Sequence, residues 1–203
     1  MKSNVCKIEK GTRDLDAILK ESERVAEYNG LSHKQALQLR LLCEEIDGML
    51  PNIIDDFEGE LWIDFENGVC KINVCIKIPE LNVDKKRELI SIAKNKKNAA
   101  ALGIVGKIRN AIENFFLDEE IMGSFVLPAG SFGMESAYCD YAYFWRLEEY
   151  RSSLQKEEQS EAWDELEKSV IASASDDVIV GVKGKCAEIV VIKRFAQGDK
   201  NEN

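Results

Sequence analysis

The sequence predicts a single α+β domain, built as a two-layer α/β sandwich in which a mostly antiparallel, mixed sheet carries helices on one face. Two segments alternate apolar and polar residues on either side of a glycine-containing turn, a pattern typical of β-hairpins. Several other segments are amphipathic at helical spacing. Strand and helix segments do not alternate regularly along the chain, so a parallel sheet of β-α-β units is not expected.

Two helices are predicted in the N-terminal quarter of the chain. The first spans about residues 14–28 and ends near Gly30, because glycine readily adopts the left-handed conformation that closes helices. The second follows Ser32, which forms a capping box with Gln35. Its apolar residues recur at helical spacing up to Pro51, which is expected to end or kink the helix because its ring interrupts the hydrogen-bond ladder.

Two β-hairpins are predicted, each with one buried face. Residues 59–78 alternate on both sides of an Asn67-Gly68 turn. Residues 176–195 alternate on both sides of a turn at 183–185. We expect the two hairpins to pair into one sheet, with the helices of residues 32–50 and 98–116 on the same face.

The chain between the hairpins is predicted to be mainly helical. A third helix should follow Asn98 and extend over residues 98–116, and residues 118–137 look irregular. Two polar-rimmed helices should follow, an aromatic one around residues 138–154 and another around residues 157–172.

Length and composition indicate one folded unit. The chain has 203 residues, of which 45% are apolar, and this is sufficient for one well-buried core. We expect a single domain over residues 1–195, with a helical insertion at about 117–175 and a disordered tail at 196–203.

Charge and cysteine usage exclude several classes of function. There are 27 basic and 37 acidic residues, a net charge of -10, so nucleic acid is not an expected partner. The six cysteines form no C-x-x-C pair, and the single histidine is His33, so neither a metal site nor a disulfide framework is indicated. Buried free thiols are expected instead. With no signal peptide or membrane-spanning run, a cytoplasmic protein is expected.

The stretch LLCEEIDGML, residues 41–50, places three carboxylates in the last turns of an apolar helix. On a helical wheel, Glu45 lies beside the buried stripe, whereas Glu44 and Asp47 point further out. Glu45 is therefore the candidate catalytic residue, and the other two are expected to be solvated. The alternative interpretation is that Glu45 simply belongs to a polar helix edge.

A candidate phosphate site lies in KNKKNAAALGIVGKIRN, residues 94–110. Lysines including Lys97 precede a helix capped by Asn98, and a helix N-terminus offers free N–H donors and the positive end of a dipole. Gly103 and Gly106 would each cost that helix about 1 kcal/mol relative to alanine, so close approach by a ligand or another backbone would explain them. An ordinary capped helix packed on the sheet is the alternative.

The order of these parts resembles the histidine-kinase-like ATPases (the GHKL superfamily), particularly the anti-sigma-factor serine-kinase branch. In that family a strand and helix lead to an E-x-x-x-N helix, a hairpin, a D-x-G-x-G loop, a lid, a G-x-G-L-x-I-V helix start and a final hairpin. VAEYNGLSHKQALQLRLLCEEIDGML resembles the first two helices, ALGIVGKIRNAI the glycine-box helix and DDVIVGVKGKCAEIVVIK the closing hairpin. The likeness covers residues 5–112 and 176–194.

Carried over residue by residue, the resemblance implies a degenerate nucleotide site. Glu45 takes the place of the family's glutamate, which polarises the attacking water or substrate hydroxyl, and the asparagine position four residues later is Met49. A thioether is a poor ligand for magnesium, so magnesium is not expected. In place of the adenine-reading loop, IPELNVD offers Glu80 for the aspartate and Asn82 and Asp84 for the glycines.

The resemblance therefore implies an ATP-binding or regulatory module related to the anti-sigma-factor kinases, with weak or no catalysis and a regulatory protein as partner. ATP would contact residues of the second helix, of the loop after the first hairpin and of the third helix. These residues are Glu45, Met49, Glu80, Asn82, Lys97, Asn98, Gly103 and Gly106. The alternative is a non-catalytic interaction domain that keeps the fold without nucleotide. An active serine kinase would need magnesium held in some other way.

Overall fold

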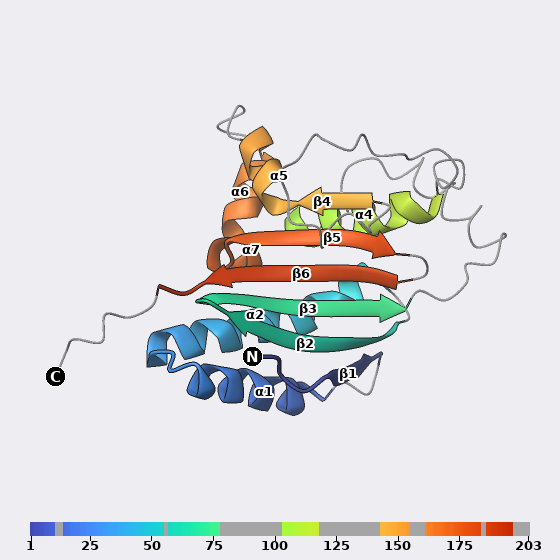
Figure 1. Ribbon diagram of the computed structural model, residues 1–203. Helices are drawn as coiled ribbons and strands as arrows, with labels where there is room; N and C mark the ends of the chain where they lie inside the picture. Colours follow the sequence, from blue (N-terminus) through green and yellow to red (C-terminus); the bar gives the residue numbers. More distant parts are fainter. Residues whose placement is uncertain are drawn as a thin grey trace, which may run out of the picture.

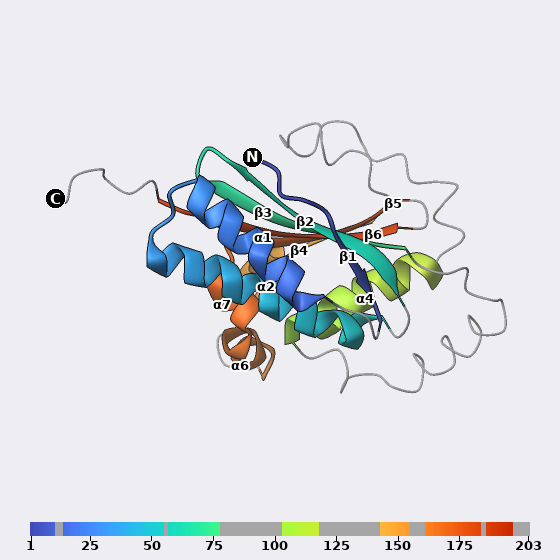
Figure 2. The same ribbon diagram turned by 90° about the horizontal axis from the view of Figure 1, so that it is seen from below.

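In a computed structural model, six strands form one antiparallel sheet, and helices cover one face of it (Figures 1 and 2). The structure describes residues 1–10, 14–54, 57–77, 103–117, 143–154, 161–183 and 186–196. The predicted two-layer α/β arrangement is confirmed. Every strand pairing within these ranges is antiparallel, so the parallel pair that a mixed sheet would contain is not found there.

The strands, in chain order, are β1 (Cys6–Glu9), β2 (Glu58–Glu66), β3 (Val69–Lys77), β4 (Tyr143–Arg146), β5 (Asp177–Lys183) and β6 (Cys186–Arg194). Their order across the sheet is β1-β2-β3-β6-β5-β4. The helices are α1 (Leu15–Tyr28), α2 (His33–Ile53), α4 (Gly103–Leu117), α5 (Leu147–Leu154), α6 (Glu161–Lys168) and α7 (Val170–Ala174).

Both predicted hairpins are present, and they form the centre of the sheet. β2 and β3 are joined by Asn67 and Gly68, whose φ angles of 50° and 78° are those that a tight hairpin turn of this kind requires. β5 pairs with β6, and β6 pairs with β3 along its whole length. The prediction that the two hairpins belong to one sheet is therefore confirmed.

The first helix begins and ends, and the second begins, as the sequence predicts. Asp14 caps α1, and its Oδ1 accepts a hydrogen bond from the backbone N–H of Ala17 at 3.0 Å. Gly30 follows with a φ of 64°. Ser32 and Gln35 form the capping box of α2.

The sequence predicted that Pro51 would end or kink α2. The helix does not end there but continues to Ile53. A proline inside a helix removes one backbone donor, yet the ladder resumes here, because the N–H of Ile54 bonds to the carbonyl of Leu50 at 3.1 Å. Ile53 is buried in the core, and its packing favours the extra turn.

The insertion between the hairpins differs from its prediction in two places. Residues 143–146, expected inside an aromatic helix, form the edge strand β4, which pairs with β5. The helix expected around 157–172 is divided, because Ser169 caps α7 by accepting a hydrogen bond from the N–H of Ala172 at 3.3 Å. Helical spacing of aromatic residues did not outweigh pairing with β5, where aromatic side chains are also favoured.

The hydrophobic core lies between the sheet and the helices. One contiguous cluster draws buried side chains from β1, β2, β3, β5 and β6 and from each of the helices just named. It includes Ile8, Ile18, Leu39, Leu42, Ile46, Leu50, Leu61, Ile63, Ile72, Ile76, Ile108, Leu147, Ile171, Val180 and Ile189. Cys6, Cys43 and Cys70 belong to it and are buried free thiols, as predicted, whereas Cys75 and Cys186 are only half-buried and Cys139 lies outside the described residues. Burial raises the pKa of the Cys70 thiol to about 12, so it stays protonated at neutral pH.

Candidate functional site

The three carboxylates near the end of α2 lie in three different environments. Glu44 forms an ion pair with Arg40 at 3.1 Å, and Arg40 also reaches Glu23 of α1 at 2.7 Å. Glu45 is half-buried, and Asp47 is 5% exposed. The expectation that Glu44 points outward is in keeping with its exposure, but the expectation that Asp47 is solvated is wrong.

The burial of Asp47 follows from the position of α1. Asp47 comes seven residues after Arg40, which places it on the same side of α2 two turns later. Because Arg40 contacts α1 through Glu23, this side faces the α1–α2 interface. A helical wheel assumes a single buried stripe against the sheet, whereas α2 also packs against α1.

Glu45 lies on a different side of α2, one that faces the other helices. Gln38, seven residues earlier, donates from Nε2 to the carbonyl of Ala174 in α7 at 3.4 Å. The same seven-residue spacing places Glu45 on the side of α2 that carries Gln38. α2 packs against both α7 and α4 (Figure 2). A half-buried carboxylate there can accept hydrogen bonds from a group bound beside α2.

Met49, one turn after Glu45, is 4% exposed and belongs to the main core. Its side chain therefore contributes packing to the end of α2. The sulfur is a weak acceptor and a poor ligand for a hard cation.

α4 begins at Gly103, which has a φ of 78°. A residue with this φ cannot stand inside a continuous α-helix, so the predicted helix running from Asn98 through Gly103 is wrong at its start. Gly103 is instead the residue at which the chain enters the helix. Gly106 lies in the first turns and is buried, and the next turns bury Ile104 and Ile108.

The packing of α4 positions its first turn within the helical layer. α4 contacts α2, α6 and the strands β4 and β5. On its outer side, the Lys107 ammonium lies 5.1 Å from the ring centroid of Tyr150 in α5, a cation–π contact. The Tyr150 ring is 6.0 Å from that of Trp145 in β4.

Of the predicted site residues, the structure brings Glu45 and Met49 on α2 into the same layer as Gly103 and Gly106 on α4. Glu80, Asn82, Lys97 and Asn98 lie outside the described residues. The described part of the site thus consists of one carboxylate on α2 and the N–H donors of a helix that starts at a left-handed glycine.

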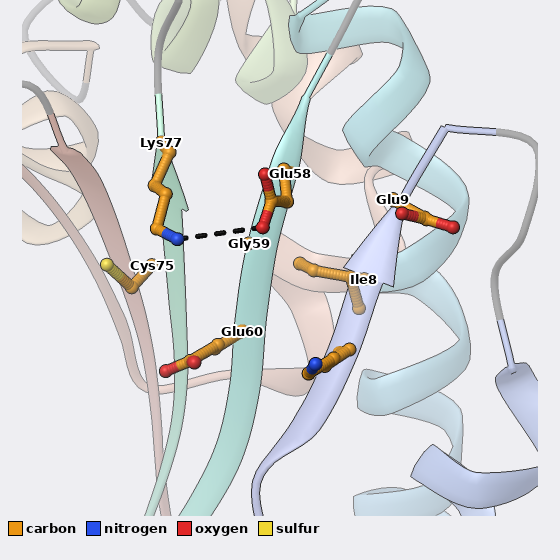
Figure 3. Close-up of a pocket in the computed structure, with 8 residues that line it drawn as sticks. Ile8, Glu9, Glu58, Gly59, Glu60, Cys75 and Lys77 are labelled. Atoms are coloured by element: carbon orange, nitrogen blue, oxygen red, sulfur yellow. Dashed lines mark ion pairs between the residues drawn. The ribbon is translucent and has the colours of Figure 1, made fainter.

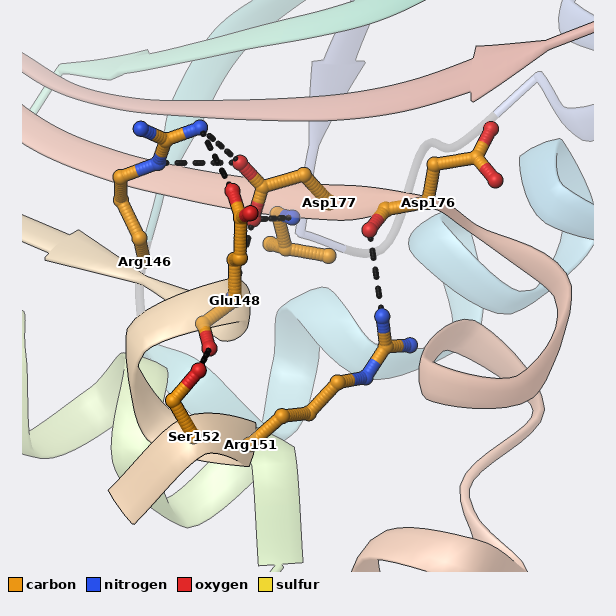
Figure 4. A network of polar contacts seen from close by, with 7 residues as sticks. Arg146, Glu148, Arg151, Ser152, Asp176 and Asp177 are labelled. Atoms are coloured by element: carbon orange, nitrogen blue, oxygen red, sulfur yellow. Dashed lines mark hydrogen bonds and ion pairs between the residues drawn. The ribbon is translucent and has the colours of Figure 1, made fainter. Parts of the chain in front are cut away.

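β4 and α5 are held to strand β5 by a polar network that the sequence did not predict (Figure 4). The Asp177 side chain is 3% exposed, and its Oδ2 accepts from Arg146 Nε at 3.0 Å and from Arg146 Nη2 at 2.5 Å. Asp177 Oδ1 accepts from the backbone N–H groups of Glu148 and Val178, so the carboxylate also caps the first turn of α5. Nothing in the sequence marked the pair, because its members are far apart in the chain.

Arg151 extends the same network to α7. Its guanidinium donates to the carbonyls of Ala172 and Ser175, at the end of α7, and to the carbonyl of Asp176 at 3.1 Å. Carbonyls at a helix C-terminus lack partners within the helix, so a cation there satisfies them and complements the dipole. The two arginines therefore fasten the C-terminal part of the insertion to the closing hairpin.

A shallow depression lies elsewhere, at the β1–β2–β3 side of the sheet (Figure 3). It is lined by Lys7, Ile8, Glu9, Glu58, Gly59, Glu60, Cys75 and Lys77. The Lys77 ammonium is 3.6 Å from Glu58, and both side chains are well exposed. Paired exposed charges of this kind contribute little to stability.

Two further properties concern the described residues alone. No three His, Cys, Asp or Glu side chains in these ranges are grouped so that they could hold a metal ion. None of the helices found there is both long enough and apolar enough to span a membrane.

Comparisons with known proteins add no relative to this picture. No family model, curated protein or solved structure matches the chain.

Proposed function

We propose that this chain is a nucleotide-binding regulatory module of the histidine-kinase-like ATPase type, related to the anti-sigma-factor kinases, with a site too degenerate for efficient phosphoryl transfer. The observation that carries the proposal is the packing of α2, with Glu45, against α4, with its left-handed Gly103, on one face of the sheet. The order of α2, a hairpin, α4 and a closing hairpin along the chain is the order that the resemblance implies.

The proposed mode of binding needs no metal. Backbone N–H groups at the start of α4 would donate hydrogen bonds to phosphate oxygens, and the helix dipole would favour the negative charge of the phosphate. Gly103 would let a phosphate approach the backbone closely, since glycine has no side chain and readily adopts the φ of 78° found at the entry to the helix. Glu45 would lie beside the phosphates as a lone carboxylate.

Catalysis should be weak because the site lacks the asparagine that would help to hold a metal ion. Phosphoryl transfer depends largely on metal ions that neutralise the developing charge. The position expected to supply an asparagine carries Met49, a core residue that is 4% exposed. A glutamate without that partner has little to activate.

The test is calorimetric titration with a non-hydrolysable ATP analogue, with and without magnesium and at two salt concentrations. We expect weak binding that is nearly independent of magnesium and is reduced by salt, because charges more than about 8 Å apart are largely screened at physiological ionic strength. No heat at millimolar ligand with folded protein would favour the alternative, an interaction domain without nucleotide. Affinity that rises strongly with magnesium would contradict the assignment of the asparagine position to Met49.

Two neighbouring glutamates provide a matched pair of variants. Glu45→Gln should tighten binding a few-fold, because it removes a negative charge beside the phosphates, a repulsion on the order of 1 kcal/mol in water at 4 Å. Glu44→Gln should leave binding unchanged, because Glu44 faces Arg40 on the α1 side. Equal effects of the two variants would contradict the proposed position of the nucleotide.

A pair of glycines gives a second control. Gly103→Ala should weaken binding, because an L-residue with a positive φ is strained and its Cβ would crowd the entry to α4. Gly30→Ala carries a similar strain at a φ of 64°, but lies after α1. It should lower stability without lowering affinity.

A further inference from the structure

Two cysteines lie side by side on the sheet face that carries no helices. The β3–β6 register pairs Cys75 with Glu188 and Lys77 with Cys186, so the two cysteines are diagonal neighbours on the same face. The interaction with the Cys186 thiol also contributes to the raised pKa of Cys75. The two cysteines are therefore neighbours, although they come from strands far apart in the chain.

Exposure separates this pair from the other described cysteines. Cys75 and Cys186 are half-buried, whereas Cys6, Cys43 and Cys70 are buried in the core on the opposite side of the sheet. Within the described residues, Cys75 and Cys186 thus form the dithiol that a small reagent can reach. Cys75 also lines the depression of Figure 3.

The two thiols have opposite electrostatic surroundings. In the register of the sheet, Cys75 stands between Glu60 of β2 and Glu188 of β6. Cys186 stands opposite Lys77 of β3. Burial, the neighbouring Cys186 and the two glutamates raise the pKa of Cys75 to about 12, so Cys75 keeps its proton at neutral pH.

We propose that Cys75 and Cys186 are a reversible disulfide site, in which Cys186 is the attacking thiol and Cys75 the resolving thiol. The oxidant is a small-molecule disulfide, RSSR. The two glutamates that flank Cys75 disfavour the negative charge that an attacking sulfur carries, so the attacking role falls to Cys186. Because acidic side chains flank Cys75, a neutral or cationic disulfide is favoured over an anionic one.

The exchange takes place in two balanced steps. The Cys186 sulfur loses its proton and attacks one sulfur of RSSR, which forms a Cys186–SR bond and releases RS⁻. The Cys75 sulfur then loses its proton and attacks the Cys186 sulfur, which forms the Cys75–Cys186 bond and releases a second RS⁻. The two leaving groups take up the two protons, so one RSSR is reduced to two RSH.

The sheet geometry favours reversibility. Diagonal neighbours in a ladder are about 7–8 Å apart, slightly beyond the usual Cα separation of a disulfide. Cys186 is the first residue of β6, and a strand end shifts more easily than a strand centre. A cross-link formed there is strained, and strained disulfides are the ones that thiols readily reduce.

The experiment uses hydroxyethyl disulfide, a neutral probe, on the folded full chain, followed by alkylation and peptide mapping. Wild-type protein should lose two alkylatable thiols, yield a linked Cys75–Cys186 peptide, and regain both thiols in dithiothreitol. Cys75→Ser should trap a mixed disulfide on Cys186. In Cys186→Ser, Cys75 should react with the probe about ten-fold more slowly than Cys186 does in Cys75→Ser, because a protonated thiol is a poor nucleophile.

Peptide mapping of the wild-type protein does not depend on whether the variants fold. Circular dichroism shows whether each variant is folded. Absence of the linked peptide in folded wild type at excess probe would overturn the proposal. Faster reaction at Cys75 than at Cys186 would overturn the assignment of the two roles.

Discussion

Glu21 of α1 fastens the segment before β1 to the helical layer. Its carboxylate accepts hydrogen bonds from the backbone N–H and the Nδ2 of Asn4 at 3.0 and 2.9 Å, and it pairs with Arg24 at 2.7 Å. Burial alone would raise the pKa of Glu21, but the bonds from Asn4 and Arg24 outweigh it and lower the pKa. This stabilisation is therefore present above the unfolded-state pKa of 4.5 and is lost as the pH falls through the lower folded value.

Glu21→Gln should consequently cost about 1 kcal/mol at pH 7, since the amide accepts weaker hydrogen bonds than the carboxylate. The variant should also lose less stability than the wild type on acidification below the unfolded pKa. Urea unfolding at pH 7 and pH 3 measures both effects. Glu27→Gln, at an exposed position on the same helix, is the control. Parallel pH curves for wild type and Glu21→Gln would contradict the assigned role.

Gly59 in β2 is a position where glycine is needed for space. A Cβ added there would lie 2.4 Å from the carbonyl oxygen of Cys75 in β3, a distance that requires the backbone to move. Gly59→Ala should therefore destabilise the protein by about 2 kcal/mol. Gly48→Ala, at an exposed site inside α2 with open space around it, should stabilise by up to about 1 kcal/mol. Chemical denaturation of the two variants gives opposite signs if this is correct.

At the scale of elements, local patterns predicted most of the fold. Asp14, Ser32 and the Asn67-Gly68 turn each act through residues within four positions, so their effect can be seen in the sequence. β4 could not be found in this way, because it exists through pairing with β5 more than thirty residues later. The burial of Asp47 likewise depends on α1 packing beside α2.

The two helices that carry the candidate residues were predictable to a similar extent. The sequence identified Glu45 on α2 and a glycine-bearing helix with its start at Asn98, and the structure places both helices in one layer. It could not place the helix start correctly, because φ at a glycine is set by the chain that precedes it. It also gave no sign of the Arg146–Asp177 pair, since the two residues meet only across two paired strands.

That pair should decide whether β4 and α5 stay attached to the sheet. Arg146→Met leaves the Asp177 carboxylate, 3% exposed, without its cation, and loss of one partner of a buried pair costs about 3 kcal/mol. Amide exchange in the β4–β5 ladder should accelerate by a large factor. Glu148→Gln removes an exposed partner of Arg146 and should change stability by no more than about 0.5 kcal/mol. Similar effects of both variants would indicate that the Arg146–Asp177 contact is not the fastening.

For the whole molecule, the shared core suggests one cooperative unit. The main cluster joins side chains from both hairpins, from α1, α2 and α4, and from the insertion elements α5, α6 and α7. An insertion that formed its own domain would carry a separate core. Its helices instead contribute Leu147, Leu154, Leu166 and Ile171 to the cluster that the sheet also lines.

The three tryptophans allow this cooperativity to be measured, because they report on different parts of the molecule. Trp62 lies on the helix-free face of β2, where Lys2 stacks on its ring at 4.8 Å. Trp145 in β4 and Trp163 in α6 both pack against the main core from the insertion. We expect single-tryptophan variants, made by replacing the other two with phenylalanine, to give urea midpoints that coincide with one another and with circular dichroism, as in a two-state transition.

An earlier midpoint for Trp145 and Trp163 than for Trp62 would show that residues 143–174 unfold first. Lost amide protection in β4 at the same urea concentration would then identify the Arg146–Asp177 contact as the place where cooperativity fails.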